Sequence, residues 1–182
     1  GAGSDAAAVR TSAKKNEDGT WTLNGEKIWI TNGPIADLFT VFAKTGEKPG
    51  ELSAFLVERA WRGVSSGPKE EKMGIRASAT SSVLFDNVCI PAENLLGNEG
   101  EGFKIAMRIL NSGRSGLCGG CVGAMKRAIE LAIEHAQQRK QFGKKLSEFG
   151  LIQDKLARMN ILCFAGESLV SMVAGLIDRG SK

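Results

Sequence analysis

The sequence predicts an α+β protein in which an antiparallel β-sandwich or small barrel is followed by long antiparallel helices that begin an up-down bundle. Short runs with strand-like alternation fill the first half of the 182 residues, and apolar residues recur every three or four positions in the second half. The period changes near Pro91. We therefore expect a β domain over residues 1–93 and the first two helices of a bundle over residues 94–182.

The first strand pattern surrounds Asn24-Gly25, a dipeptide typical of two-residue hairpin turns. Apolar residues alternate with polar ones on both sides of it, at Trp21, Leu23, Ile28 and Ile30. Further strand-like runs at 38–43, 52–57 and 81–85 are separated by glycine, proline and charged residues. Several short strands at this spacing favour a sandwich or barrel.

The helical pattern covers residues 102–139, as one long helix or two stacked ones, and then about 147–178. Glycines interrupt the first stretch at positions 113, 116, 119, 120 and 123. Each costs roughly 1 kcal/mol of helix propensity relative to alanine, so we expect close packing there against another helix or a ligand. Two such helices alone leave wide apolar faces exposed, which indicates partners outside this sequence.

Composition excludes several classes of protein. The net charge is +4, but Lys and Arg are scattered among Asp and Glu, which indicates a solvated surface and no nucleic-acid role. The four cysteines do not form a secreted disulfide framework, so a reducing compartment is expected. We find no apolar run of about 18 residues and no stretch with the basic end and apolar centre of a leader, so no part of this sequence is expected to span or target a membrane. The beginning inside a glycine-rich motif and the end directly after a helix suggest a fragment of a longer protein.

Few residues could carry catalysis by themselves. His135 is the single histidine, without carboxylates at metal-ligand spacing, so a serine hydrolase or a zinc enzyme has little support. Cys118 and Cys121 have the C-x-x-C spacing of redox sites but lack a second pair and fall inside a helix, where small packing residues are the better interpretation.

Three short stretches suit a planar cofactor that carries phosphates. The run KIWITNG (27–33) offers an indole, Trp29, with a hydroxyl, Thr31, two residues on along the same strand face. The run RKQFG (139–143) offers a guanidinium beside an aromatic ring, and GAGSD (1–5) offers glycines and a serine for an anion. Each has a simpler reading: Trp29 as a core aromatic, Thr31 as a strand former and Arg139 as a surface residue near a helix C-terminus.

Taken together and in order, these runs resemble the acyl-CoA dehydrogenase family. The same resemblance includes MGIRAS (73–78), NVCIPAENLLG (87–97) and GFKIAM (102–107), and it covers essentially the whole sequence. The stretches ILNSGR (109–114) and LSEFGLIQ (146–153) are most similar to the very-long-chain subgroup, which includes an assembly factor for respiratory complex I.

The resemblance implies an FAD site between a middle β domain and a C-terminal four-helix bundle. FAD contacts are implied for Gly3, Ser4, Trp29, Ile30, Thr31, Arg139, Gln141 and Phe142. Trp29 would flank the isoalloxazine, Thr31 would bond its N5 and O4 edge, and Arg139 would reach the pyrophosphate of an FAD held mainly by a neighbouring subunit. Acyl-CoA contacts are implied for Ser4, Ser78, Asn111 and Arg114. For Ser78, a surface turn serine is an equal alternative.

The implied activity is α,β-dehydrogenation of long or very-long-chain acyl-CoA to trans-2-enoyl-CoA in mitochondrial β-oxidation. A homodimer would pass its electrons to electron-transfer flavoprotein. The alternative is an assembly role in complex I that reuses the same framework. Two departures from the family pattern stand out. Gly113 occupies the place where some members carry the base glutamate, so the base is expected outside this sequence, and Gly150 replaces a glutamine that often contacts FAD.

Overall fold

The computed structural model describes residues 5, 8–48 and 50–180. The chain divides into two compact units, residues 1–108 and 109–182. The first unit contains β1 (Ser12–Lys15), β2 (Trp21–Thr31), β3 (Leu38–Lys44), β4 (Leu52–Glu58), β5 (Val64–Ser66), β6 (Thr80–Ile90), the short helix η2 (Ala92–Asn94) and β7 (Leu95–Leu96). The helix α1 (Gly102–Gln138) begins in the first unit and continues into the second.

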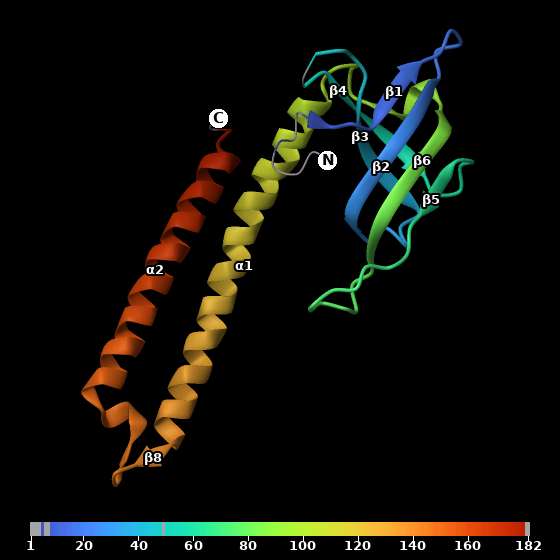
Figure 1. Ribbon diagram of the computed structural model, residues 1–182. Coiled ribbons are helices and arrows are strands. Elements are labelled where there is room, and N and C mark those ends of the chain that lie inside the picture. The colour runs from blue at the N-terminus through green and yellow to red at the C-terminus, as the bar shows by residue number, and fades with distance from the viewer. Residues whose placement is uncertain (1–4, 6–7, 49, 181–182) are drawn as a thin grey trace. The chain divides into compact units, whose positions relative to one another are not determined.

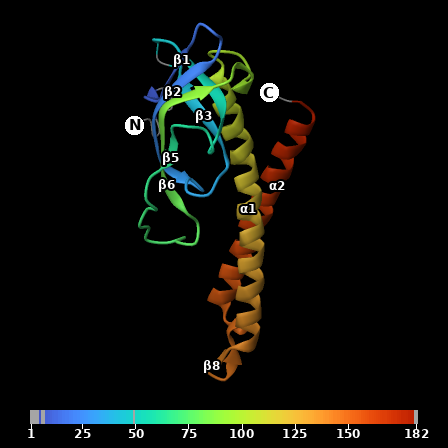
Figure 2. The ribbon, with the colours of Figure 1, turned by 90° about the vertical axis from the view of Figure 1, so that its right-hand side faces the viewer.

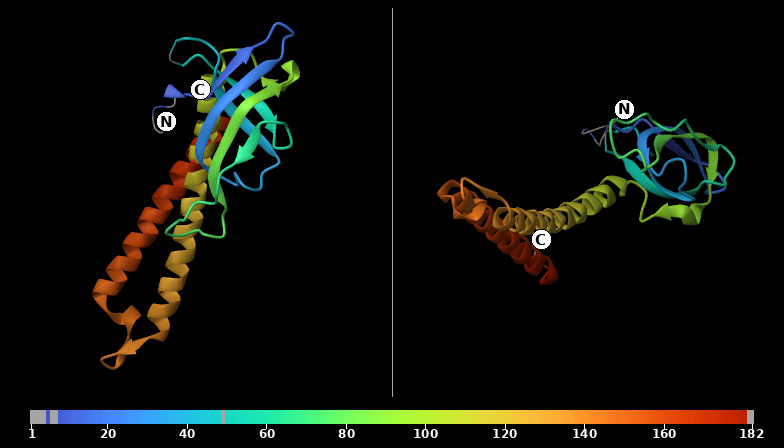
Figure 3. Two further views of the ribbon diagram at one scale, coloured as in Figure 1. Left: turned by 45° about the vertical axis from the view of Figure 1, so that its right-hand side comes forward. Right: turned by 90° about the horizontal axis from the view of Figure 1, so that it is seen from below.

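The strands of the first unit form one curved sheet in the order β5-β6-β2-β1-β3-β4-β7 (Figures 1 and 3). Its pairs are antiparallel except for β1 and β3, which pair in parallel at Ser12 and Lys44. The α+β prediction is therefore confirmed, although the sheet is mixed and not purely antiparallel. Its core centres on Trp21 and Phe55, whose rings meet edge to face with centroids 5.2 Å apart.

The predicted hairpin turn at Asn24-Gly25 is wrong, because β2 runs through both residues without turning. The turn between β1 and β2 lies instead at residues 16–20, where Asn16 donates its backbone N–H to Thr20 O at 2.8 Å. Asn24 instead stabilises a β-bulge, because its side-chain oxygen accepts a hydrogen bond from the backbone N–H of Asn87, which lies in β6 with a φ of 49°. Asn24 and Asn87 together accommodate one extra residue of β6 opposite β2.

The second unit contains most of α1, a small hairpin of β8 (Lys140–Gln141) and β9 (Lys144–Lys145), the short helix η3 (Leu146–Glu148) and α2 (Gly150–Asp178). The two helices run in opposite directions and are joined at one end by this hairpin (Figures 1 and 2). Their contact face contains Val122, Ile129, Ala136 and Cys163, which are buried. Lys126 of α1 and Glu167 of α2 form an ion pair across the helices, and this hydrogen bond raises the pKa of Lys126.

The close approach between the helices lies at Gly166. A Cβ there would lie 3.3 Å from Met125 Cε, whereas a Cβ at any of the five predicted glycines of α1 would meet no other described atom within 4 Å. Close packing at those five positions is therefore not found among the described residues. Wide apolar surfaces are exposed as predicted, for example at Leu117 (70%), Phe164 (74%) and Leu151 (80%).

The helix α2 is long and apolar enough to cross a membrane by length and composition, with a mean hydropathy of 1.7 over its most apolar window. The sequence prediction considered only unbroken apolar runs, and α2 meets this criterion although polar residues such as Asn160 and Glu167 interrupt it. Only 6% of that window is buried within the described chain. A bundle helix with its other partners outside the described residues meets the same criterion.

Candidate functional site

A bulge near the end of β2 places Trp29 on the surface. Lys27 pairs with Val83 and Ile30 with Ser81, so three steps along β2 match two along β6. Trp29 lies in the extra step with a φ of 58°, and its side chain is 59% exposed. The interpretation of Trp29 as a core aromatic is therefore wrong.

The same bulge breaks the alternation that the sequence predicts for β2. Ile28 is 56% exposed and does not share a buried face with Ile30, which packs against the core. Thr31 pairs with Thr80 and is exposed, so Trp29 and Thr31 stand on either side of an inward-facing Ile30. An aromatic residue with positive φ is costly, and such strain is concentrated at functional sites.

A tight turn follows Thr31 and is held from three directions. Asn32, with a φ of 62°, donates its backbone N–H to Ala79 O at 2.7 Å and accepts from the backbone of Ile35 and Ala36. Gly33 is buried so closely that a Cβ would lie 2.7 Å from Ser81 Oγ. From the end of β4, Arg59 donates to the carbonyls of Gly33 and Ala36.

Lys27 fills a gap beside the bulge. Its ammonium donates to Phe42 O of β3 at 2.7 Å, at a point beyond the end of β1, the short strand that lies between β2 and β3 and pairs only with residues 21–24 of β2. Apart from Lys27 itself and Thr40, the surrounding hollow is lined by apolar residues, namely Ile30, Phe39, Val41, Phe42, Val83 and Phe85. Burial in this setting lowers the pKa of Lys27 to about 8.

Ser78 lies at the end of the loop between β5 and β6. Its backbone N–H donates to Ile75 O at 3.1 Å, and its carbonyl accepts from Lys72 Nζ at 2.6 Å. Because the carbonyl of the next residue, Ala79, accepts a hydrogen bond from the backbone N–H of Asn32, this loop lies beside the turn that follows Thr31. Ser78 is thus both a turn serine and a neighbour of the Trp29 segment.

In the second unit, Arg139, Gln141 and Phe142 gather at the β8–β9 hairpin. Arg139 follows α1 directly and is exposed, and its carbonyl accepts the backbone N–H of Leu146 at 2.9 Å. Phe142 and Gly143 have φ values of 53° and 79°, the left-handed pair that a two-residue hairpin requires. Phe142 is 93% exposed, so a bulky aromatic is presented to solvent from a strained position.

The predicted acyl-CoA residues of α1 lie together. Arg114 Nη1 donates to Asn111 Oδ1 at 3.0 Å, and Gly113 stands between them. Arg114 also lines an apolar hollow between α1 and α2, with Cys118, Leu169, Val173 and Ile177 among its other residues. The helical rise puts Arg114 about 37 Å from Arg139 along α1. The side chains of Arg114 and Arg139 are therefore too far apart to contact the same part of one ligand.

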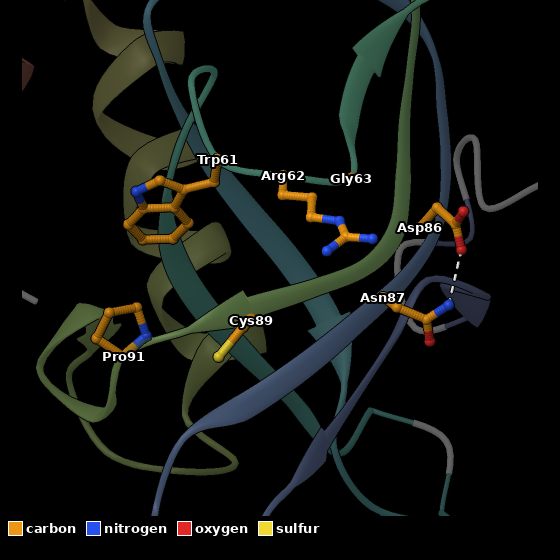
Figure 4. Close-up of a pocket in the computed structure, with 7 residues that line it drawn as sticks. All are labelled: Trp61, Arg62, Gly63, Asp86, Asn87, Cys89 and Pro91. Atoms are coloured by element: carbon orange, nitrogen blue, oxygen red, sulfur yellow. Dashed lines mark hydrogen bonds between the residues drawn. The ribbon is translucent and has the colours of Figure 1, made fainter.

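Of the predicted FAD residues, Gly3 and Ser4 fall outside the residues that the structure describes. A hollow of about 650 Å³ on the first unit contains none of the predicted residues; its lining is Trp61, Arg62, Gly63, Asp86, Asn87, Cys89 and Pro91 (Figure 4). Cys118 and Cys121 are exposed free thiols.

The sequence analysis did not predict that Arg59 holds the turn after Thr31, because a single arginine after a strand has no pattern that indicates such a role.

Comparison with known proteins identifies the kind of protein that combines this sheet with these helices. The middle domain of acyl-CoA dehydrogenases matches residues 1–88, and the C-terminal domain of the same enzymes matches residues 100–182. The chain belongs to the acyl-CoA dehydrogenase family.

The relatives are similar over nearly the whole chain. It is 52% identical to the very long-chain specific acyl-CoA dehydrogenase, mitochondrial, of Bos taurus, over 98% of this chain and 28% of that protein. It is 47% identical to the short-chain specific acyl-CoA dehydrogenase of Megasphaera elsdenii, over 95% of this chain and 46% of that protein. The chain thus spans less than half the length of these relatives.

Solved structures support the same fold. Butyryl-CoA dehydrogenase from Megasphaera elsdenii superposes with a TM-score of 0.91 and 45% identity, over 100% of this chain and 48% of that one. An acyl-CoA dehydrogenase from Bacillus anthracis, solved in complex with FAD, gives a TM-score of 0.85 and 46% identity, over 96% of this chain and 30% of that one.

Proposed function

We propose that the protein containing this chain is an FAD-dependent acyl-CoA dehydrogenase that converts long or very-long-chain acyl-CoA to trans-2-enoyl-CoA. The observation that carries the proposal is the exposed indole of Trp29, held at positive φ beside the exposed Thr31. A strained aromatic on the surface has no role in the core and suits a planar ligand. The identity of 50–52% to mitochondrial very-long-chain enzymes supports the substrate class and a mitochondrial location.

The described residues fit FAD. Trp29 offers an apolar plane for the isoalloxazine, and Thr31 offers a hydroxyl for its polar edge, while the backbone of Ile30 lies between them. At the β8–β9 hairpin, Arg139 offers a fork that can donate two parallel bonds to a pyrophosphate, with Gln141 and Phe142 beside it. FAD, when bound, accepts the hydride from the β-carbon of the substrate.

In this proposal, the residues of this chain bind the flavin and the acyl-CoA and hold them in position. A hydrogen bond donated by Thr31 stabilises negative charge at the edge of the flavin. Arg114, held by a hydrogen bond to Asn111, supplies a cation for the CoA part of the substrate, and Ser78 contacts the pantetheine arm. No glutamate stands at Gly113, so the base that removes the α-proton is supplied from elsewhere in the complete protein.

We further propose a division into a middle domain, residues 1–93, and the start of a helical domain, residues 94–182. This boundary falls between the two stretches matched to family domains. A homodimer is part of the proposal, because Arg139, just after the end of α1 and far from Arg114, is expected to reach the FAD held mainly by a neighbouring subunit.

The proposed electron acceptor is an electron-transfer flavoprotein. This acceptor is the one that the resemblance to acyl-CoA dehydrogenases implies. Assembly of respiratory complex I is the alternative that subgroup resemblance leaves open, and the dehydrogenase role ranks first because the similar curated relatives are named as dehydrogenases.

Anaerobic addition of palmitoyl-CoA to the purified complete protein tests the proposal. Bleaching of the oxidised flavin band supports dehydrogenation, and butyryl-CoA is the matched control for chain length. A flavin that stays oxidised with palmitoyl-CoA and with longer substrates would contradict the proposed activity. Capture of complex I assembly proteins by a variant without its base would then favour the alternative.

A further inference from the structure

Arg59 links the end of β4 to the turn that follows Trp29 and Thr31. Its Nε donates to Ala36 O, its Nη2 to Gly33 O, and its Nη1 to Ser66 Oγ at 3.1 Å. The backbone N–H of Arg59 also donates to Asp37 O at 2.8 Å. Both the main chain and the side chain of Arg59 therefore hold residues 33–37.

We propose that Arg59 is a positioning residue that fixes Trp29 and Thr31 in the geometry that the flavin requires. This inference rests on the proposed function, because it concerns the same site. It adds a residue from a different strand, distant from the family motif around Trp29, that acts through the turn at Gly33.

The Trp29 segment needs such support because its backbone is strained. Trp29 and Asn32 both have positive φ, and the bulge at Trp29 removes part of the pairing between β2 and β6. Residues in such conformations persist only where their surroundings over-determine them. On one side Ala79 bonds Asn32, and on the other Arg59 bonds Gly33 and Ala36.

The chemistry of these contacts calls for arginine. Three separate N–H groups of one planar guanidinium reach two backbone carbonyls and a hydroxyl, and the group also lies 5.3 Å from the centre of the Phe39 ring. Lysine places one ammonium at the end of a flexible stem and cannot span these acceptors in the same way. Ser66 completes the arrangement, since its hydroxyl donates to Gly33 O at 2.9 Å.

The alternative is that Arg59 only stabilises the β domain. The two roles differ in what the flavin reports. A purely stabilising residue changes the melting temperature and leaves the bound flavin unaltered, whereas a positioning residue also changes the absorption envelope and the reduction potential of FAD, because both depend on the contacts of Trp29 and Thr31.

The experiment compares Arg59→Lys with Arg62→Lys in the complete FAD-loaded protein. Arg62 lies three residues further along the same segment, is exposed and, among the described residues, donates no hydrogen bond to residues 33–37, so it is the matched control. We expect Arg59→Lys to shift the flavin spectrum and potential and to raise the dissociation constant for FAD about tenfold. We expect Arg62→Lys to match the wild type in all three.

A second variant, Ser66→Ala, keeps the test decisive if Arg59→Lys does not fold. It removes one partner of the guanidinium and one bond to Gly33, so we expect a smaller shift of the flavin spectrum in the same direction. A wild-type spectrum and potential in every folded variant would overturn the role of Arg59 and leave the proposed function standing. A wild-type protein that binds no FAD would overturn both.

Discussion

Replacing Trp29 by alanine and by glycine separates the strain at this position from the function of the indole. Both changes remove the ring, but only glycine adopts a φ of 58° without steric cost. We therefore expect the glycine variant to be more stable than the alanine variant. Both should lose affinity for flavin if the indole lies against the isoalloxazine.

The size of the difference follows from the backbone. A left-handed conformation destabilises a residue with a Cβ by roughly 1–2 kcal/mol, and glycine avoids this cost. Glycine also makes the unfolded chain more flexible, which destabilises the folded state by about 0.4–1 kcal/mol relative to alanine. The net advantage of glycine is thus about 0.5–1 kcal/mol. In an ordinary strand the sign is reversed, since glycine is less stable than alanine by about 0.5–1 kcal/mol.

Melting temperatures of the purified complete protein, freed of FAD, measure this difference. A pair of changes at Thr22, in the regular part of β2 opposite Cys89, is the matched control. Thr22→Ala should melt above Thr22→Gly, whereas Trp29→Gly should melt above Trp29→Ala by about 1–3 °C. If alanine were the more stable replacement at both positions, the backbone at Trp29 would not be strained and the reasoning would fail.

Two further predictions concern a buried charge and the hairpin. Because the pKa of Lys27 falls from 10.5 to about 8 on folding, the folded state loses its proton first as pH rises, and the free energy of unfolding should increase between these values. Denaturant titrations should show that the free energy of unfolding rises by about 2 kcal/mol more in the wild type than in Lys27→Met over this pH range. This value is smaller than the full pKa shift implies, because the side chain is only half-buried. An equal pH dependence in both proteins would refute the prediction. Arg139→Lys should lower the flavin retained after dialysis, because a point charge replaces a bidentate fork. The exposed Arg158, substituted in the same way, should leave flavin content unchanged.

The regular elements could be predicted because their apolar residues repeat with a clear period. The strands at 38–44 and 52–58 and the helix over 102–138 lie where alternation and helical spacing place them. The short strands β1 and β5 were not predicted, since four and three residues are too few to show a period. Asn24-Gly25 gave a false hairpin because the bulge at Asn87 uses the same residue types as a turn.

The residues of the candidate site could also be predicted only in part. Trp29, Thr31, Arg139 and Phe142 were found through motifs, and their roles toward FAD stay predictions. The exposure of Trp29 and its positive φ could not be predicted, because a bulge depends on the register with β6, which is distant in sequence. Arg59 and the lowered pKa of Lys27 likewise depend on neighbours from other strands.

A crystal structure of the complete protein with FAD tests the central claim most directly. We expect the indole of Trp29 to lie in van der Waals contact with the isoalloxazine, about 3.5–4 Å away, and the guanidinium of Arg139 to lie within hydrogen-bond distance of a flavin pyrophosphate in the same or a neighbouring subunit. An FAD bound where neither Trp29 nor Arg139 of any subunit touches it would show that these residues do not form the flavin site.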